Sequence, residues 1–165
     1  MTGTGITLEV KIDDKAVLRA FNDLQNRMAN TKPIMQAIGT GLVGTVQKRL
    51  GDGSLAGRWA PLNPTYRAGK KNKNMLVESG ALRGSISEQA GQDYVKVGTN
   101  KVYAAIHQFG GTIHAKDAPA LFFKMGSGFI RPKSVTIPAR PFLTIEREDE
   151  QMIADIVFRF LQLSK

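Results

Sequence analysis

The sequence predicts an α+β fold in which two N-terminal helices and a C-terminal helix pack on one face of an antiparallel or mixed sheet. Apolar residues alternate over residues 6–12, recur at helical spacing from Val17 to Val46, and form one helical face again along residues 146–161. The chain has 165 residues, the length of one ordinary domain, so we expect a single domain over residues 1–165.

The N-terminal third predicts one strand and two helices. Residues 6–12, ITLEVKI, place aliphatic side chains on one side and polar ones on the other, as a half-buried strand does. A first helix is predicted over residues 14–30, where apolar side chains recur at spacings of three and four. A second helix over residues 33–50 begins at Pro33, which suits a first helical turn because the N–H it lacks would be unpaired there.

The second helix contains Gly39, Gly41 and Gly44, which have the spacing of the glycines in dinucleotide-binding loops. That motif binds a pyrophosphate only where it follows a strand and opens a helix. Here it lies in the middle of a helix. We therefore interpret these glycines as sites of close contact with another helix.

Residues 51–78 show no periodicity and are rich in Gly, Pro, Asn and Lys, which predicts a long basic loop or arm. Two interpretations stay open. Trp59 and Tyr66 lie among cations, which suits stacking on nucleic acid, and such an arm can also become ordered only against a neighbouring subunit. The cations are Arg58, Arg67, Lys70, Lys71 and Lys73.

The middle of the chain predicts two hairpins separated by a short helix. Residues 82–89 and 94–98 flank a turn-forming AGQD. A short helix over residues 102–109 ends at two glycines. Residues 121–125 and 129–137 flank Gly126-Ser127-Gly128 and predict a second hairpin.

A final amphipathic helix is expected after residue 145. Acidic residues over 146–150 favour a helix N-terminus because its dipole is positive there. Ile153, Ile156 and Phe160 then share one face of that helix.

Composition leaves no candidate for catalysis or metal binding. Cysteine is absent, which excludes disulfides, thiolate metal sites and a cysteine nucleophile. His107 and His114 are seven residues apart with only Asp117 near them, too few ligands for a metal site. No serine stands in a nucleophile elbow and no glycine-rich loop binds phosphate, so we predict no enzyme and no cofactor. No apolar run is long enough to cross a membrane.

The net charge of +9 invites a nucleic-acid partner where the charge is clustered. The excess lies mainly in residues 51–80 and 101–140, whereas residues 141–165 are net negative. A basic module that binds nucleic acid without sequence preference is therefore one alternative, beside an ordinary solvated surface.

Five segments, in order, carry a resemblance to a known family. They are GRWAPL at 57–62, ESGALRGSI at 78–86, VGTN at 97–100, YAAIHQFGG at 103–111 and IPARPFL at 137–143. Together they resemble the phage Mu-like virion morphogenesis proteins, also described as tail-completion proteins of tailed bacteriophages. Residues 115–134 depart from the family as an insert, which is expected to form a projecting hairpin. The resemblance implies a non-enzymatic structural protein of the tail or neck. It would act in tail completion, tail termination or head–tail joining as a subunit of a ring, commonly six-fold.

The resemblance also implies partners and a location. Other tail or neck proteins would bind the ring, DNA in its channel would be contacted without specificity, and the virion would hold the protein after assembly in the host cytoplasm.

Arg140, between Ala139 and Pro141, either anchors its own turn or reaches a neighbour's carboxylate or helix C-terminus.

Two sets of residues follow from this resemblance and from the charge pattern. The residues expected to hold the shape of the subunit are Trp59, Tyr103, His107, Gln108, Phe109, Gly110, Gly111, Arg140, Pro141 and Phe142. The cations expected to face neighbouring subunits or DNA are Arg58, Arg67, Lys70, Lys71, Lys73, Lys124, Arg131 and Lys133. His107 is expected to be structural, hydrogen-bonded to a turn.

Overall fold

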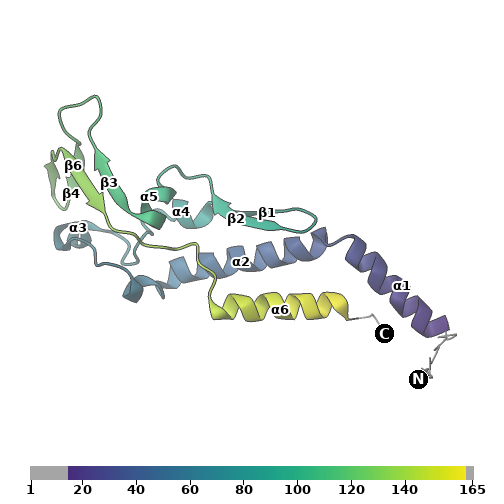
Figure 1. Cartoon of the computed structure of the whole chain (residues 1–165). Coiled ribbons are helices and arrows are strands. Elements are labelled where there is room, and N and C mark those ends of the chain that lie inside the picture. The colour runs from purple at the N-terminus through teal and green to yellow at the C-terminus, as the bar shows by residue number, and fades with distance from the viewer. Residues whose placement is uncertain (1–14, 163–165) are drawn as a thin grey trace, which may run out of the picture.

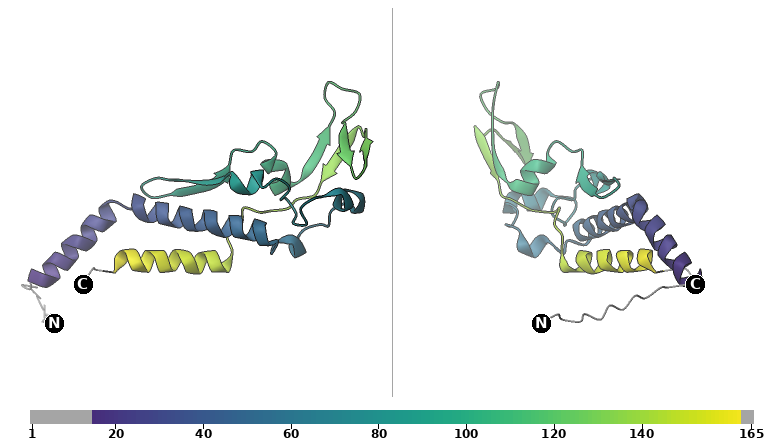
Figure 2. Two further views of the ribbon diagram at one scale, coloured as in Figure 1. Left: turned by 180° about the vertical axis from the view of Figure 1, so that it is seen from behind. Right: turned by 45° about the vertical axis from the view of Figure 1, so that its right-hand side comes forward.

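The computed structural model describes residues 15–162. Its centre is a long helix, α2 (Lys32–Asp52), which lies between a β-hairpin on one side and the C-terminal helix α6 (Arg147–Leu161) on the other (Figure 1). Helix α1 (Lys15–Ala29) projects at an angle from the N-terminal end of α2 (Figure 2). The strand expected at residues 6–12 lies outside the described residues.

The three long helices are confirmed within a few residues of their predicted ends. Pro33 lies in the first turn of α2, and Gly53 ends that helix in the left-handed conformation with a φ of 72°. Helix α6 opens with a capping box in which Glu146 and Asp149 each accept a hydrogen bond from the other's backbone N–H.

The prediction that the glycines of α2 contact another helix is confirmed for Gly41 and wrong for Gly39 and Gly44. A Cβ on Gly41 would lie 2.6 Å from the Met152 sulfur on α6. A Cβ on Gly39 would lie 2.6 Å from a Val95 methyl group in the hairpin, and one on Gly44 would meet nothing within 4 Å. Both neighbours of α2 therefore approach its backbone directly.

The prediction of α+β class is confirmed, but that of one sheet covered by helices is wrong. Within residues 15–162 the strands form three separate antiparallel pairs. The first pair, β1 (Ile86–Ala90) and β2 (Val95–Thr99), packs on α2. It starts later than expected because residues 81–84 form a helical turn, α4 (Ala81–Gly84).

The other two pairs lie at the end of the molecule away from α1 (Figure 1). Strand β4 (Phe123–Met125) pairs with β5 (Gly128–Ile130), and β3 (Gly111–His114) pairs with β6 (Ser134–Ile137). The single strand expected at residues 129–137 is thus two strands. Pro132 lies between them, and its missing N–H interrupts a ladder.

Residues 51–78 are more structured than an irregular arm. They contain a 3₁₀ turn, η1 (Ala56–Arg58), and a short helix, α3 (Pro64–Gly69). Asn63 caps α3 by accepting hydrogen bonds from two backbone N–H groups with its side chain. Leu55, Trp59 and Val77 are buried, so this segment forms part of the core.

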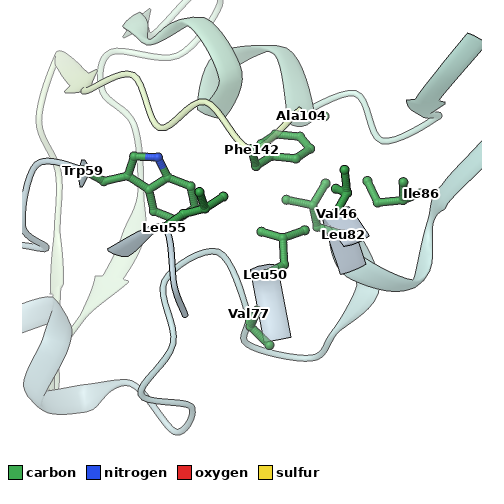
Figure 3. Packing of buried hydrophobic residues seen from close by; sticks show 9 residues of the cluster. All are labelled: Val46, Leu50, Leu55, Trp59, Val77, Leu82, Ile86, Ala104 and Phe142. Carbon is green, nitrogen blue, oxygen red and sulfur yellow. The ribbon is translucent and has the colours of Figure 1, made fainter. Parts of the chain in front are cut away.

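The main core lies where the C-terminal half of α2 meets the irregular segments (Figure 3). It includes a side chain from the short helix α5 (Ala104–Phe109). Phe142 is completely buried although it belongs to no helix or strand. The cluster consists of Val46, Leu50, Leu55, Trp59, Val77, Leu82, Ile86, Ala104 and Phe142.

A second cluster joins the N-terminal half of α2 to α6 and β2. Ile34, Ile38 and Leu42 are its buried members. No helix between residues 15 and 162 combines the length and the apolar character that crossing a membrane requires.

Candidate functional site

Gln108 on α5 holds the segment 137–143 by three hydrogen bonds. Its Oε1 accepts from the backbone N–H groups of Phe142 and Leu143, both at 3.0 Å. Its Nε2 donates to the Leu143 carbonyl oxygen at 3.2 Å. The Gln108 side chain thereby supplies hydrogen-bond partners to backbone N–H and C=O groups at the buried Phe142 and at Leu143. These groups need such partners because these two residues pair with no neighbouring strand.

Arg140 and Trp59 add the segment 57–62 to the same place. The Arg140 Nη2 donates to the carbonyl oxygens of Ala60 and Pro61 at 3.0 and 3.3 Å, and its backbone N–H donates to His107 O at 2.7 Å. The Trp59 Nε1 donates to the Pro141 carbonyl at 3.1 Å. We call this set of contacts, made by Trp59, Gln108 and Arg140, the junction. Of the two roles open to Arg140, anchoring within the subunit is the one that this geometry fills.

Gly110 and Gly111 are required by the backbone path beside the junction. Gly110 has a φ of 72°, and a Cβ there would lie 2.7 Å from the Ala139 nitrogen. Gly111 has a φ of 146°, and its Cβ would lie 2.8 Å from an Ile106 methyl group. Both positions favour glycine on conformation, and Gly110 also on space, because its close neighbours are backbone atoms. Strand β3 begins at Gly111, which pairs with Ile137 of β6.

A cavity of about 600 Å³ opens next to the junction. Its wall is mostly apolar, from α4, β4 and β6, and Tyr66, His107 and Arg140 add polar groups to it. This volume is typical of a small-molecule site. No cluster of three or more His, Asp or Glu that could hold a metal ion occurs within residues 15–162.

His107 is held by packing more than by hydrogen bonds of its ring. Its Nδ1 is buried without a hydrogen-bond partner, and Tyr103 lies edge-on with ring centroids 6.1 Å apart. Burial, and then the positive charge of Arg140, lowers the pKa of His107. The expected bond to a turn is made by its backbone carbonyl, which accepts from Arg140.

Sequence reasoning missed a buried ion pair that joins α2 to α6. The Arg49 Nη1 lies 3.0 and 2.9 Å from the two carboxylate oxygens of Asp149, and its Nη2 donates to the Thr144 carbonyl at 3.0 Å. Burial alone would raise the pKa of Asp149, but hydrogen bonds, chiefly from Arg49 and the Glu146 N–H, hold that pKa below its usual value. In sequence Arg49 is one of many cations near a helix end.

Comparison with known proteins matches these segments to one family. The profile of the phage virion morphogenesis family matches residues 12–162, which include every segment of the junction. The chain belongs to the phage virion morphogenesis family. No solved structure matches the chain.

Two relatives of this virion morphogenesis protein match along nearly their whole lengths. The Mu-like prophage FluMu G protein 2 of Haemophilus influenzae is 31% identical over 158 residues, which cover 94% of this chain and 97% of the relative. The putative capsid assembly protein G of Escherichia phage Mu is 24% identical over 160 residues, 92% of each chain.

The residues that resemble the virion morphogenesis family divide into a buried and an exposed group. Trp59, Arg140 and Phe142 are buried, and Gln108 bonds to the last of these. Tyr103 is 41% exposed and Phe109 is 78% exposed. The first group lies in or bonds to the interior, whereas the second exposes aromatic side chains to solvent.

The basic residues of this virion morphogenesis protein also divide. Arg58 pairs with Glu146 at 2.8 Å, and Lys70 pairs with Glu78 at 2.9 Å and donates to the carbonyls of Asn72 and Val77. The Lys70 side chain is only 5% exposed, so its charge is used within the chain. Arg58 is exposed despite its pairing, and within residues 15–162 the exposed members of the predicted set that form no ion pair are Arg67, Lys71, Lys73, Lys124, Arg131 and Lys133.

The exposed cations come from two segments that the fold brings together. Helix α3 contacts β4, and a Cβ on Gly69 would lie 2.9 Å from Gly126 Cα. The basic residues of 67–73 and 124–133 therefore lie at one end of the molecule. Trp59 is not part of that surface, because it is buried in the core, which removes the stacking role considered for it.

Proposed function

We propose that this protein is a structural subunit of the phage tail or neck, which acts in tail completion, tail termination or head–tail joining as an oligomeric ring. The observation that carries the proposal is the extended shape of the molecule, together with the apolar side chains that are exposed on its projecting helix α1. Helix α1 projects from the body and none of its residues is buried (Figure 1). Phe21 and Met28 on this helix are each 57% exposed.

Large apolar side chains that are exposed together on one surface are typical of a protein that binds partners. Further aromatic surface is present elsewhere, since Phe158 on α6 is 64% exposed and Phe109 is 78% exposed. The relative from phage Mu is named a putative capsid assembly protein, which fits a role among other virion proteins. A subunit of this size encloses a channel only by forming a closed ring with copies of itself.

The decisive experiment is sedimentation velocity with native mass spectrometry on the purified chain, alone and with purified tail proteins. We expect a discrete closed oligomer, commonly of six subunits, whose population rises with concentration. A strict monomer under all of these conditions would overturn the proposal. Electron microscopy of virions made without the protein should show heads and tails that form but do not join, and normal virions would contradict it.

A second proposal concerns DNA, and the joined basic surface of segments 67–73 and 124–133 supports it. In a ring this surface would be repeated in each subunit and would attract DNA phosphates without reading the bases. We expect the assembled protein to bind duplex DNA with a steep salt dependence. Replacing Lys71, Lys73 and Lys124 with glutamine should weaken that binding and lower the salt slope, whereas the same change at Lys32, Lys48 and Lys96, which are exposed elsewhere, should leave it nearly unchanged.

The alternative of a free-standing nucleic-acid-binding module makes a different prediction. It requires the isolated monomer to bind DNA with the same salt slope as any assembled form. Binding that appears only with oligomerisation would favour the ring.

A further inference from the structure

Helix α6 has two apolar faces, of which α2 covers one. Met152, Ile153 and Ile156 on the inner face pack against α2. On the outer face Ala154, Phe158 and Leu161 follow at spacings of four and three, with Phe158 64% and Leu161 37% exposed. A surface helix of a globular protein needs only one apolar face, so the outer face of α6 is available to a partner.

Helix α1 carries an apolar stripe that matches this face. Phe21, Leu24 and Met28 lie on one side of the helix, with Leu18 beside them. Leu18 is 46% exposed, and Phe21 and Met28 are each 57% exposed. Helices α1 and α6 have 15 residues each, about 22 Å, so one can lie along the whole of the other.

Within one chain α1 does not lie along the outer face of α6. It meets α6 near its own C-terminal end, where the Arg27 Nη1 donates to the carbonyl oxygens of Phe160 and Gln162 at 3.0 and 2.8 Å. From that point α1 runs away at an angle (Figure 2). The long sides of the two helices therefore face different directions.

The charges of the two helices are opposite. Helix α1 carries Lys15, Arg19 and Arg27 against one acid, Asp23. Helix α6 carries Glu148, Glu150 and Asp155 in addition to the buried Asp149, against two arginines. Because the whole chain has a net charge of +9, most of its surface repels the basic helix α1 of a second copy, whereas the acidic helix α6 attracts it.

We propose that α1 of one copy packs along the outer face of α6 in a second copy. The contact joins two different surfaces, so each subunit offers one of each and the interaction continues from copy to copy until a ring closes. This inference rests on the proposed ring and adds the surface through which it forms. The occupant of the outer face of α6 is thereby a second copy of this chain.

The absence of cysteine from the chain allows a direct test by disulfide cross-linking. Gln25 on α1 and Ala154 on α6 are exposed and lie near the middle of their helices, so they meet whichever way the helices run. The variant Gln25→Cys/Ala154→Cys should give, on oxidation, a ladder of covalent oligomers that ends at the size of the ring. A mixture of the two single variants should give dimers and nothing larger.

The matched control moves the first cysteine by one residue. Asn26 is exposed on the opposite side of α1 from the stripe, so Asn26→Cys/Ala154→Cys should cross-link at least tenfold more slowly. Equal rates for the two pairs would overturn the proposal. So would efficient dimers of Gln25→Cys alone, which indicate an α1–α1 contact, or a disulfide within one chain, which indicates that α1 folds back on its own α6.

A variant without cysteine tests the same face. Phe158→Ser should abolish the oligomer in sedimentation velocity, whereas Val102→Ser, at a side chain that is 96% exposed elsewhere, should leave it intact. Both variants should keep the far-ultraviolet circular dichroism spectrum of the wild type, which shows that the subunit still folds; loss of the oligomer alone lowers the thermal midpoint of Phe158→Ser. An oligomer in the wild type that survives Phe158→Ser and yields no ladder would overturn this interface but not the ring, whereas a wild type that is always monomeric would overturn both.

Discussion

The buried pair of Arg49 and Asp149 shows how one residue on each of two helices fixes their relative position. Asp149 is completely buried, and its carboxylate also accepts the Glu146 N–H at 2.8 Å. One group thus caps α6 and joins it to α2. A buried ion pair contributes little net stability compared with an apolar pair, but removal of one partner leaves an unpaired charge in the interior.

We expect Asp149→Ala to lower the free energy of unfolding by about 3–5 kcal/mol. The double variant Arg49→Met/Asp149→Leu should lose much less, because no charge remains buried. Urea unfolding followed by the fluorescence of Trp59, the only tryptophan of the chain, measures both. A double variant as unstable as the single one would show that the pair itself supplies the stability.

His107 predicts a pH dependence of stability. Its pKa is lowered in the folded state, so the folded protein binds protons more weakly than the unfolded chain, whose histidine has a pKa of about 6.5. The contribution of neutral His107 is therefore fully present above about pH 6.5 and is lost as the pH falls through the lower folded pKa. Urea unfolding at several pH values should show this decline, and His107→Leu should remove it while the acid-side decline caused by Asp149 remains.

At the scale of elements, the glycines of α2 give a matched comparison. Gly44→Ala adds a methyl group in open space within a helix and should stabilise the protein by up to about 1 kcal/mol. Gly39→Ala forces Val95 and Glu88 away from α2 and should destabilise it by about 1–3 kcal/mol. Thermal unfolding of the two variants checks the opposite signs, and a stabilising Gly39→Ala would contradict the close packing of the hairpin.

Sequence patterns predicted the helices better than the strands, for a physical reason. A helix of 15 residues or more repeats its apolar spacing several times, so α1, α2 and α6 are visible from local periodicity alone. Strands of three to five residues contain one or two repeats, so their pairing depends on distant residues. The pairing of β3 with β6 joins residues that are far apart in the chain, such as Thr112 and Thr136, and the glycines and Pro132 near these strands do not indicate a partner.

The junction was predictable in its members but not in its contacts. The resemblance pointed to Trp59, Gln108 and Arg140, but their bonds run to backbone carbonyl and amide groups more than thirty residues away, which leave no trace in side-chain patterns. Arg49 and Asp149 lie a hundred residues apart. Each has an ordinary local interpretation, a cation near the end of a helix and an acid near the beginning of one.

At the scale of the whole molecule, the buried Trp59 reports on the core and not on the basic surface. DNA that binds to the surface of segments 67–73 and 124–133 should not contact the indole, which lies in the main core. The wavelength of tryptophan emission should therefore be short and should not change when DNA is added, although anisotropy of labelled DNA reports binding. A large shift or quenching on binding would place DNA at the core or show that it opens the junction.

Helix α2 sets a limit on how the length of this chain can vary in evolution. Its N-terminal end adjoins α1 and its C-terminal end adjoins the core and the junction. Each inserted residue would lengthen the helix by about 1.5 Å and turn one end by about 100° relative to the other. A single insertion would therefore misalign α1 with every surface beyond the core, and insertions and deletions among relatives should concentrate in the segment 115–134, whose ends return to the paired strands β3 and β6.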